Sequence, residues 1–345
     1  IQSGFINGAA NGSNTSSGND DLGDPLTIGG RNDSFTALDG WISEVLTFGS
    51  AISVADRQSL ETSQDGYFAI SGAATAWSSQ GNWSYTSGGV AGAPVPTAAD
   101  ATYFDGGSTV TCDVDVAATS ASITMANSYT GILAFGNNAL TVAGTADLRS
   151  GGTFTGSTGG IVLSATGTLI PPSATTLPNV TVTTGIATLA TNNLNVAGTL
   201  SISGGNLIAN GRSISVAGNW ANSVGVGGFS AGTGTVTLNG AGGSTQVISG
   251  NTTFDSLTAT CTMARTLNFT AGTTQTIGGT LTLTGASGQL LSLRSTTPAS
   301  TWSLTPSGTR TCSYVDVQDG TNTVSPAVNP ASSVDSGNTT LWFGT

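Results

Sequence analysis

The sequence contains no histidine and no lysine, and only two glutamates, Glu44 and Glu61. The lack of histidine removes the commonest general base and a common zinc ligand. The lack of lysine excludes Schiff-base catalysis and lysine-based isopeptide cross-links. All seven basic residues are arginines, scattered along a chain of net charge −11, so no cluster of positive charge is present to bind nucleic acid. These absences exclude most catalytic chemistries and argue against a nucleic-acid partner.

Other scarcities limit the class of fold. No apolar run approaches the length of a membrane span, and only 7% of the residues are charged. Hydrophobic residues make up 37% of the chain, which is too many for a disordered protein. The 50 glycines follow no three-residue period, so a collagen-like structure is excluded. We therefore expect a folded chain without a membrane-spanning segment, whose surface is built mainly from neutral polar residues.

Three cysteines, Cys112, Cys261 and Cys312, each lie in a run that is typical of a β-strand. None belongs to a CxxC pair, which excludes a zinc ribbon or a thioredoxin-like motif. One interpretation is that all three are small buried residues, and the other is a single disulfide between Cys261 and Cys312. A catalytic thiol would lack the histidine that usually activates it.

Residues 1–70 differ from the rest of the chain. Segments 4–13, 25–31 and 39–50 have the alternation of apolar and polar residues that is typical of strands. They are followed by SVADRQSLETS at 53–63, which begins with a serine suited to an N-cap and predicts one short helix. The sequence thus predicts a small β-domain with one helix.

The order of these segments, with ING, LTIGGR, DGWISEVLTF and AISVADRQSLE, resembles the C-terminal part of a laminin-G or concanavalin-like jelly roll. The resemblance implies a lectin-like domain that is incomplete at its N-terminus, with sheet edges that a neighbouring subunit could complete by strand addition. Sugar and calcium sites of this family lie on loops. The corresponding loop at 17–25 carries Asp20, Asp21 and Asp24, whose carboxylates suit calcium, and a polar turn is the alternative interpretation.

Residues 71–345 consist of short runs with period-two alternation, separated by Gly, Asn and Ser. Such runs predict strands with one face inward and one face outward. The triplet VAG occurs at 196–198 and again at 216–218, and this interval suits one coil of a solenoid. We therefore predict an all-β fold in which a parallel β-helix, or β-solenoid, of about 12 coils follows the partial jelly roll. An array of β-sandwiches is the alternative.

A longer correspondence also occurs in this region. GGIVL at 159–163 matches GTVTL at 234–238, and TLPNVTV at 176–182 matches TFDSLTA at 253–259. This pattern indicates that residues 159–285 hold two divergent copies of one module of several coils.

Both ends of the predicted solenoid are rich in aromatic residues. Trp77 and Trp83 lie at its start, and Trp342 and Phe343 lie at its end, where they would cover the open core. The opening segment, and SYVDV with VDSGNTTLWF near the C-terminus, resemble the first and last segments of parallel β-helices from bacterial surface proteins. The resemblance implies an extracellular or cell-surface location and no particular activity.

Few carboxylates remain as catalytic candidates. The densest groups are Asp113, Asp115, Asp316 and Asp319. A polysaccharide-cleaving enzyme would need one of these pairs to converge with an arginine in a cleft. A solvated acidic patch is the simpler interpretation. Asp147 and Arg149 share one strand face and are expected to form a surface ion pair.

These observations predict a structural protein of the bacterial cell surface rather than an enzyme. It would serve as a stalk or filament subunit, with copies of itself or neighbouring surface proteins as partners. A carbohydrate-binding adhesin that takes glycans is the main alternative, and a polysaccharide-active enzyme or a phage fibre protein is less favoured. Calcium is the one cofactor that the sequence suggests.

Overall fold

The computed structural model describes residues 2–6, 9–14, 67–70, 76–107 and 110–344. The chain divides into two units, Ile1–Gly66 and Tyr67–Thr345. In the first unit, β1 (Gln2–Ile6) and β2 (Ala9–Asn14) form an antiparallel pair. This hairpin alone does not confirm the predicted jelly roll, and the predicted helix at 53–63 lies outside the described residues.

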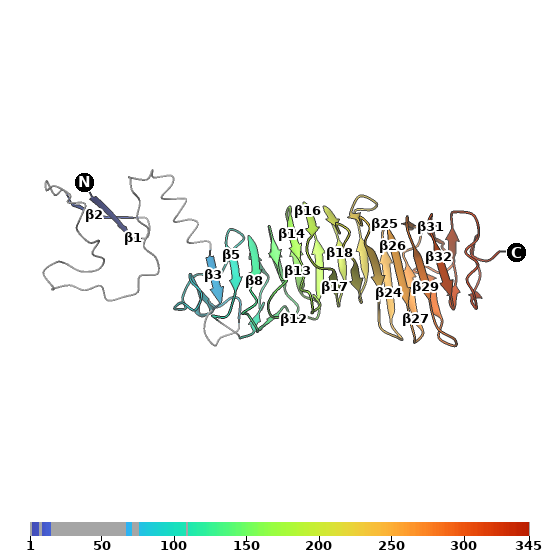
Figure 1. Ribbon diagram of the computed structural model, residues 1–345, viewed down its shortest axis with the longest axis horizontal. Helices are drawn as coiled ribbons and strands as arrows, with labels where there is room; N and C mark the ends of the chain where they lie inside the picture. Colours follow the sequence, from blue (N-terminus) through green and yellow to red (C-terminus); the bar gives the residue numbers. More distant parts are fainter. Residues whose placement is uncertain (1, 7–8, 15–66, 71–75, 108–109, 345) are drawn as a thin grey trace. The chain divides into compact units, whose positions relative to one another are not determined.

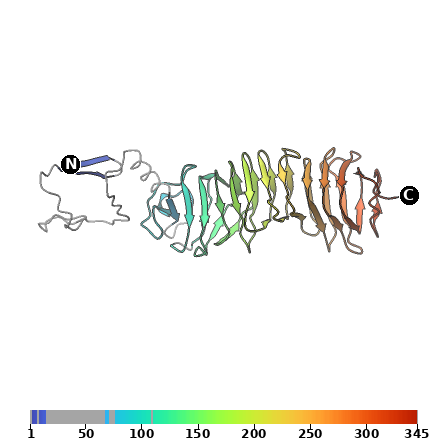
Figure 2. The ribbon, with the colours of Figure 1, turned by 45° about the horizontal axis from the view of Figure 1, so that its top comes forward.

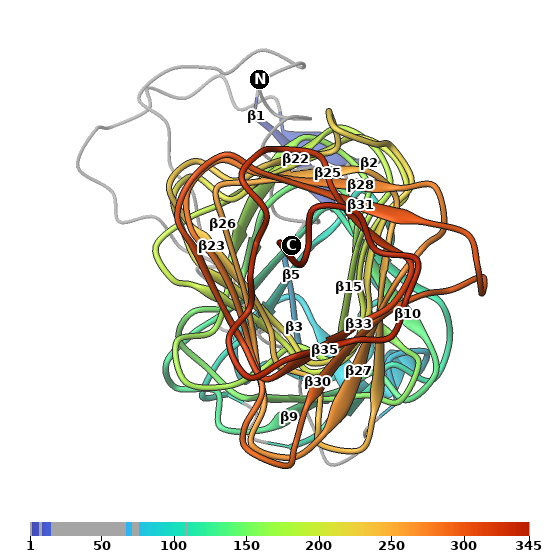
Figure 3. The same cartoon turned by 90° about the vertical axis from the view of Figure 1, so that its right-hand side faces the viewer.

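The second unit is a parallel β-solenoid, which confirms the predicted fold and excludes the β-sandwich alternative (Figure 1, Figure 2). Strands on three sides surround one core, as the view along the solenoid shows (Figure 3). We call these sides faces 1, 2 and 3, in the order in which the chain visits them. The sheet of face 1 has eleven strands, so the solenoid has about eleven turns, close to the number predicted.

Face 1 is one continuous sheet. Its strands are β7 (Ala118–Ser120), β10 (Ala139–Val142), β13 (Gly160–Leu163), β15 (Asn179–Val182), β18 (Leu200–Ile202), β21 (Trp220–Asn222), β24 (Thr245–Ser249), β27 (Arg265–Phe269), β30 (Leu291–Ser295), β33 (Val315–Val317) and β35 (Val334–Asp335). Because this sheet runs through all the coils, it ties the solenoid together along its length.

Face 2 is divided into two sheets. The first contains β4 (Trp83–Ser84), β3 (Tyr67–Ile70), β5 (Ala101–Phe104), β8 (Ser122–Met125), β11 (Ala146–Asp147), β14 (Gly167–Ile170), β16 (Ile186–Leu189), β19 (Asn206–Ile208) and β22 (Phe229–Ser230). The second contains β25 (Thr252–Phe254), β28 (Thr274–Ile277), β31 (Trp302–Pro306) and β34 (Gly320–Asn322). Strand β3 pairs in parallel with β5, so residues 67–70 belong with the solenoid and not with the first unit.

Face 3 is also divided. Its strands are β6 (Cys112–Asp113), β9 (Ile132–Ala134) and β12 (Thr153–Thr155), then β17 (Leu194–Val196), β20 (Ile214–Val216), β23 (Thr235–Leu238), β26 (Ser256–Thr260), β29 (Leu281–Thr284) and β32 (Arg310–Ser313). One 3-10 helix, η1 (Gln80–Asn82), precedes β4. The division of faces 2 and 3 leaves face 1 as the only sheet that spans the described solenoid from β7 to β35.

Coil length follows from the strand register. Val180, Leu200 and Trp220 pair in succession on face 1, so the two coils that they delimit are equal in length. On face 3 Val196 pairs with Val216, which confirms the coil predicted from the repeated VAG triplet. Burial alternates along most strands, so every second side chain enters the core and the residues between them face outward.

The longer sequence correspondence relates different faces. The run 159–163 forms β13 on face 1, whereas its match at 234–238 forms β23 on face 3. The run 176–182 likewise contains β15 on face 1, and its match at 253–259 contains most of β26 on face 3. The two predicted copies are therefore offset by one face. All three faces require the same alternation of apolar and polar residues, so similar sequence segments do not distinguish one face from another.

Aromatic side chains fill the core at three places. Trp77 and Trp83 pack edge to face in the first coil, with ring centroids 4.8 Å apart, and Trp342 packs on Trp302 in the last. A third cluster surrounds Trp220, at the point where the first sheet of face 2 ends and the second begins. We call this point the seam.

Candidate functional site

The residues predicted to bind calcium, Asp20, Asp21 and Asp24, lie outside the described residues. In the part of the chain that the structure does describe, no group of three or more Cys, Asp or Glu side chains is placed to hold a metal ion. The candidate sites among the described residues are therefore the remaining carboxylates, the cysteines and the outer faces of the solenoid.

In the first carboxylate pair, Asp113 and Asp115, one member bonds to the first coil. Asp115 accepts hydrogen bonds from the backbone N–H of Ser78, at 2.9 Å, and from its hydroxyl. Burial raises the pKa of the Asp115 carboxyl, but the bonds from Ser78 outweigh burial and hold the pKa below its usual value. An open depression of about 490 Å³ lies beside Asp113 and Asp115, and no arginine lines it. This pair therefore does not meet the requirement for convergence with an arginine.

The second carboxylate pair is split between two sets of partners. Asp316, which points outward from β33, forms an ion pair with Arg294 on β30 and accepts a bond of 2.6 Å from the Ser336 hydroxyl. Asp319 is only 3% exposed and accepts bonds from Asn338 Nδ2, at 2.7 Å, and the Ala299 backbone N–H. Only Asp316 meets an arginine, and both carboxylates connect neighbouring coils.

The predicted ion pair between Asp147 and Arg149 is confirmed. Arg149 Nη2 lies 2.8 Å from Asp147 Oδ2, and the arginine side chain is 47% exposed. An ion pair this open to solvent contributes little to stability.

The predicted Cys261–Cys312 disulfide is not formed, and all three cysteines are free thiols. Cys312 lies in β32 and Cys261 follows β26, with β29 between those two strands on face 3. Two ladder steps separate the two strands by about 9.6 Å, and Cys312 is in register with Ala259 rather than with Cys261, so the two cysteines lie beyond the span of about 7 Å between Cα atoms that a disulfide allows.

None of the thiols is set up as a nucleophile. Burial raises the pKa of Cys312 to about 11 and raises the pKa of Cys112 further. Burial also raises the pKa of Cys261, although the nearby Arg265 guanidinium acts in the opposite direction. Because the thiolate is the reactive form, all three residues are expected to react slowly at neutral pH.

A buried polar cluster inside the solenoid was not predicted. Arg265 enters the core from β27 at 3% exposure, and its Nη1 donates to Gln246 Oε1 at 2.9 Å. Its Nη2 donates to the Leu238 carbonyl, and Gln246 Nε2 donates to the Val216 carbonyl at 2.7 Å. Burial lowers the pKa of Arg265. The signal that could have found this cluster is an arginine at an inward position of the alternating run RTLNF.

A second unpredicted feature is a regular array of hydroxyls on face 3. The pattern T/S-x-T/S recurs on four successive strands, as TVT at 235–237, TAT at 258–260, TLT at 282–284 and TCS at 311–313. The register aligns the outward residues of these strands in two columns. We call the array of Thr237, Thr258, Thr282, Thr311, Thr260, Thr284 and Ser313 the hydroxyl ladder.

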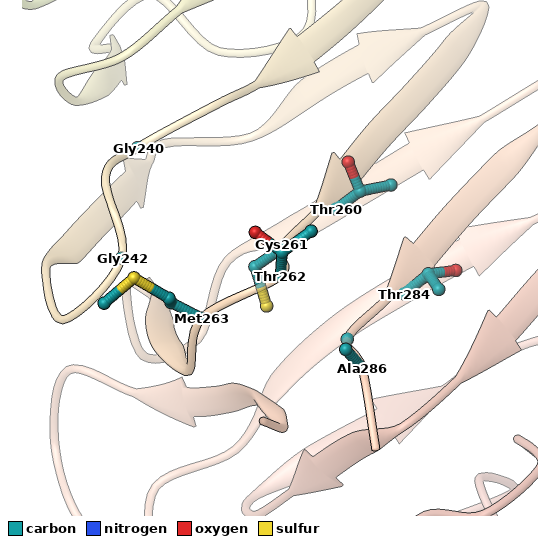
Figure 4. A pocket seen from close by; sticks show the side chains of 9 residues that line it. Gly240, Gly242, Thr260, Cys261, Thr262, Met263, Thr284 and Ala286 are labelled. Carbon is teal, nitrogen blue, oxygen red and sulfur yellow. The ribbon is translucent and has the colours of Figure 1, made fainter. Parts of the chain in front are cut away.

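An open depression of about 500 Å³ adjoins one side of the hydroxyl ladder (Figure 4). Thr260 and Thr284 lie on neighbouring strands at its edge, and Cys261 and Met263 form part of its wall (Figure 4). No charged side chain lines it. The arrangement offers neutral hydrogen-bonding groups and apolar contacts, and no acid or base.

Comparisons of the chain with protein families, with curated proteins and with solved structures found no match. Among the described residues, no helix is long and apolar enough to cross a membrane.

Proposed function

We propose that this protein is a structural protein of the bacterial cell surface, in which the solenoid serves as a stalk or as the subunit of an extracellular filament. The observation that carries the proposal is the single core of the second unit, which continues from Trp77 in the first coil to Trp342 in the last. A core of this form fixes the distance between the two ends of the solenoid, which is what a spacer requires.

The polar side chains support a structural role. Asp115, Asp316 and Asp319 bond to neighbouring coils instead of converging on one cleft. Outward positions are filled mainly by threonine, serine and asparagine, which keep a strand soluble without charge. A surface of this kind suits a durable extracellular material.

Self-assembly is the part of the proposal that a mass measurement tests. The full chain would be examined by light scattering on a sizing column, and the same fractions by electron microscopy. A polymer with a regular axial repeat is the expected result. A monomer at 33.9 kDa would overturn self-assembly. The stalk proposal would then rest only on the rigidity of the solenoid.

Limited trypsin digestion tests the stalk. Five arginines lie in the described solenoid, and Arg265, Arg294 and Arg310 all donate hydrogen bonds to backbone carbonyls. A rigid stalk should resist cleavage at these three residues in native buffer and lose its resistance in denaturant. Rapid native cleavage after Arg265, which is the most buried of them, would contradict the proposal.

A further inference from the structure

The hydroxyl ladder of face 3 is an array of threonines, with one serine, whose register is unbroken. Thr237 pairs with Thr258, Thr258 with Thr282, and Thr282 with Thr311. In the second column Thr260 pairs with Thr284, and Thr284 with Ser313. Neighbouring strands lie about 4.8 Å apart and alternate residues of one strand about 6.6 Å apart, so the hydroxyls form a two-dimensional lattice.

The strands that carry this lattice are fixed by the core of the solenoid. Ala259 and Leu283 point inward between the two columns and are 0% exposed. Threonine is β-branched and therefore has few χ1 rotamers, so its hydroxyl and methyl groups occupy defined positions on a fixed backbone. The lattice is consequently rigid before any ligand arrives.

The hydroxyls of the ladder have no bonding partner among the described residues. Some threonine hydroxyls elsewhere do find partners: Thr183 Oγ1 donates to the Leu163 carbonyl, and the Thr305 and Thr323 hydroxyls lie 2.7 Å apart. The ladder therefore presents a full set of free donors and acceptors to whatever covers it.

The chemistry of the surface restricts the occupant. All ladder residues are neutral, and the neighbouring Arg310 guanidinium is bonded to the Pro306 and Pro326 carbonyls. A charged partner would find no complement here. The depression beside the ladder has no aromatic lining residue on which a sugar ring could stack. The surface therefore complements an uncharged ligand with small, regularly spaced hydrogen-bond donors and acceptors.

We infer that the hydroxyl ladder is an ice-binding surface. The spacing between its neighbouring strands lies close to the shorter repeat between oxygen atoms in hexagonal ice, and each free hydroxyl can both donate to and accept from a water molecule. Each threonine also carries a methyl group, which offers no hydrogen bond to disordered water. The inference is independent of the stalk proposal, since it concerns one face and not the assembly of the chain.

Thermal hysteresis and the shape of growing ice crystals test the inference with the full chain. The wild-type protein is expected to lower the freezing point below the melting point and to produce faceted crystals. Thr282→Lys places a long charged side chain in the middle of the first column, so most of the hysteresis should be lost. Hysteresis no greater than that of an inert protein at equal concentration would overturn the inference.

Thr181→Lys is the matched control. Thr181 also points outward from a solenoid strand, but its neighbours on face 1 are Val162 and Ser201, which form no threonine column. This variant should retain the wild-type hysteresis, and circular dichroism should show that both variants are folded. Equal loss in the two variants would contradict the assignment to face 3. Retention on crystalline cellulose without ice activity would reject ice in favour of a neutral polysaccharide.

Discussion

The coils before and after the seam are built differently. Before it, the residues Ile161, Val180, Leu200 and Trp220 pair in succession, and their numbers show short, nearly equal coils. After it, the coil from Ile248 to Phe269 is of nearly the same length, and the next two, which Leu267, Leu293 and Val317 delimit, are longer than any of the earlier three. The strands lengthen as well: β27, β28 and β29 together hold 13 residues, and β30, β31 and β32 hold 14, against 11 in β15, β16 and β17 and 9 in β18, β19 and β20.

Buried polar side chains are unevenly distributed along the described solenoid, and four of them lie in its first coils, at Asn82, Ser84, Thr102 and Ser120. From Ile132 to Ala221 no polar side chain is buried, whereas eight are buried between Asn222 and the C-terminal end of the described residues. Several of these donate to backbone carbonyls near the corners: Asn222 Nδ2 to Gly225 at 2.8 Å, Gln275 Nε2 to Gly250 at 2.9 Å, and Asn322 Nδ2 to Val324 at 2.8 Å. Carbonyls in the turns between strands lie outside the ladder of backbone hydrogen bonds, and these core amides satisfy them.

The seam itself should show the largest effect. Trp220 packs against Phe229 and Phe254, with ring centroids 4.9 and 5.2 Å away, so Trp220→Ala should lower the free energy of unfolding by about 4 kcal/mol. Because a solenoid is held by contacts between neighbouring coils, the urea transition should also split into two. Leu200→Ala, one coil earlier, is the control and should keep a single transition. A single transition in both variants would show that the seam does not separate the halves.

Arg265 offers the next contrast. Arg265→Met should lower the free energy of unfolding by about 3 kcal/mol, because Gln246 Oε1 and the Leu238 carbonyl lose a charged donor inside the core. Equilibrium urea denaturation would measure the loss. In the Arg265→Met protein, Gln246→Leu should lower the free energy of unfolding by less than it does in the wild type, because the two side chains form one network. Strict additivity would show that they act separately.

Asp319 tests the last coil of the solenoid. Asp319→Ala would leave Asn338 Nδ2 and the Ala299 N–H without their acceptor in a nearly enclosed position, at a cost of about 2 kcal/mol. Thermal unfolding would measure the change, and Asp335→Ala, which removes an exposed carboxylate nearby, should cost much less. Equal shifts in both variants would show that burial is not the cause.

The solenoid could be predicted because its two determinants are local. Alternation sets which side chains enter the core, and the interval between Val196 and Val216 set one coil length correctly. The offset of the two sequence copies by one face could not be predicted, because β13 and β23 need the same pattern on either face. Position around the solenoid depends on the summed lengths of all preceding corners, which no single segment encodes.

The candidate sites were harder to predict for a related reason. The pair Asp147 and Arg149 was predicted correctly because both residues lie on one short segment. Arg265 and Gln246 come from neighbouring coils, and Cys261 and Cys312 are held apart by β29. Contacts between coils depend on register, so patterns confined to one strand do not determine them.

The first coil should show the smallest effect. Asp115 is bonded to Ser78 but largely open to water, so Asp115→Asn should cost less than about 1 kcal/mol near neutral pH. The pKa of this carboxyl lies below its usual value in the folded protein, so its contribution is present above about pH 4 and is lost as the pH falls through the folded pKa. Urea denaturation of both proteins from pH 7 to pH 2 would measure this. The difference between the wild type and Asp115→Asn should shrink with acid, and a difference that grew instead would mean that the carboxylate strains the first coil.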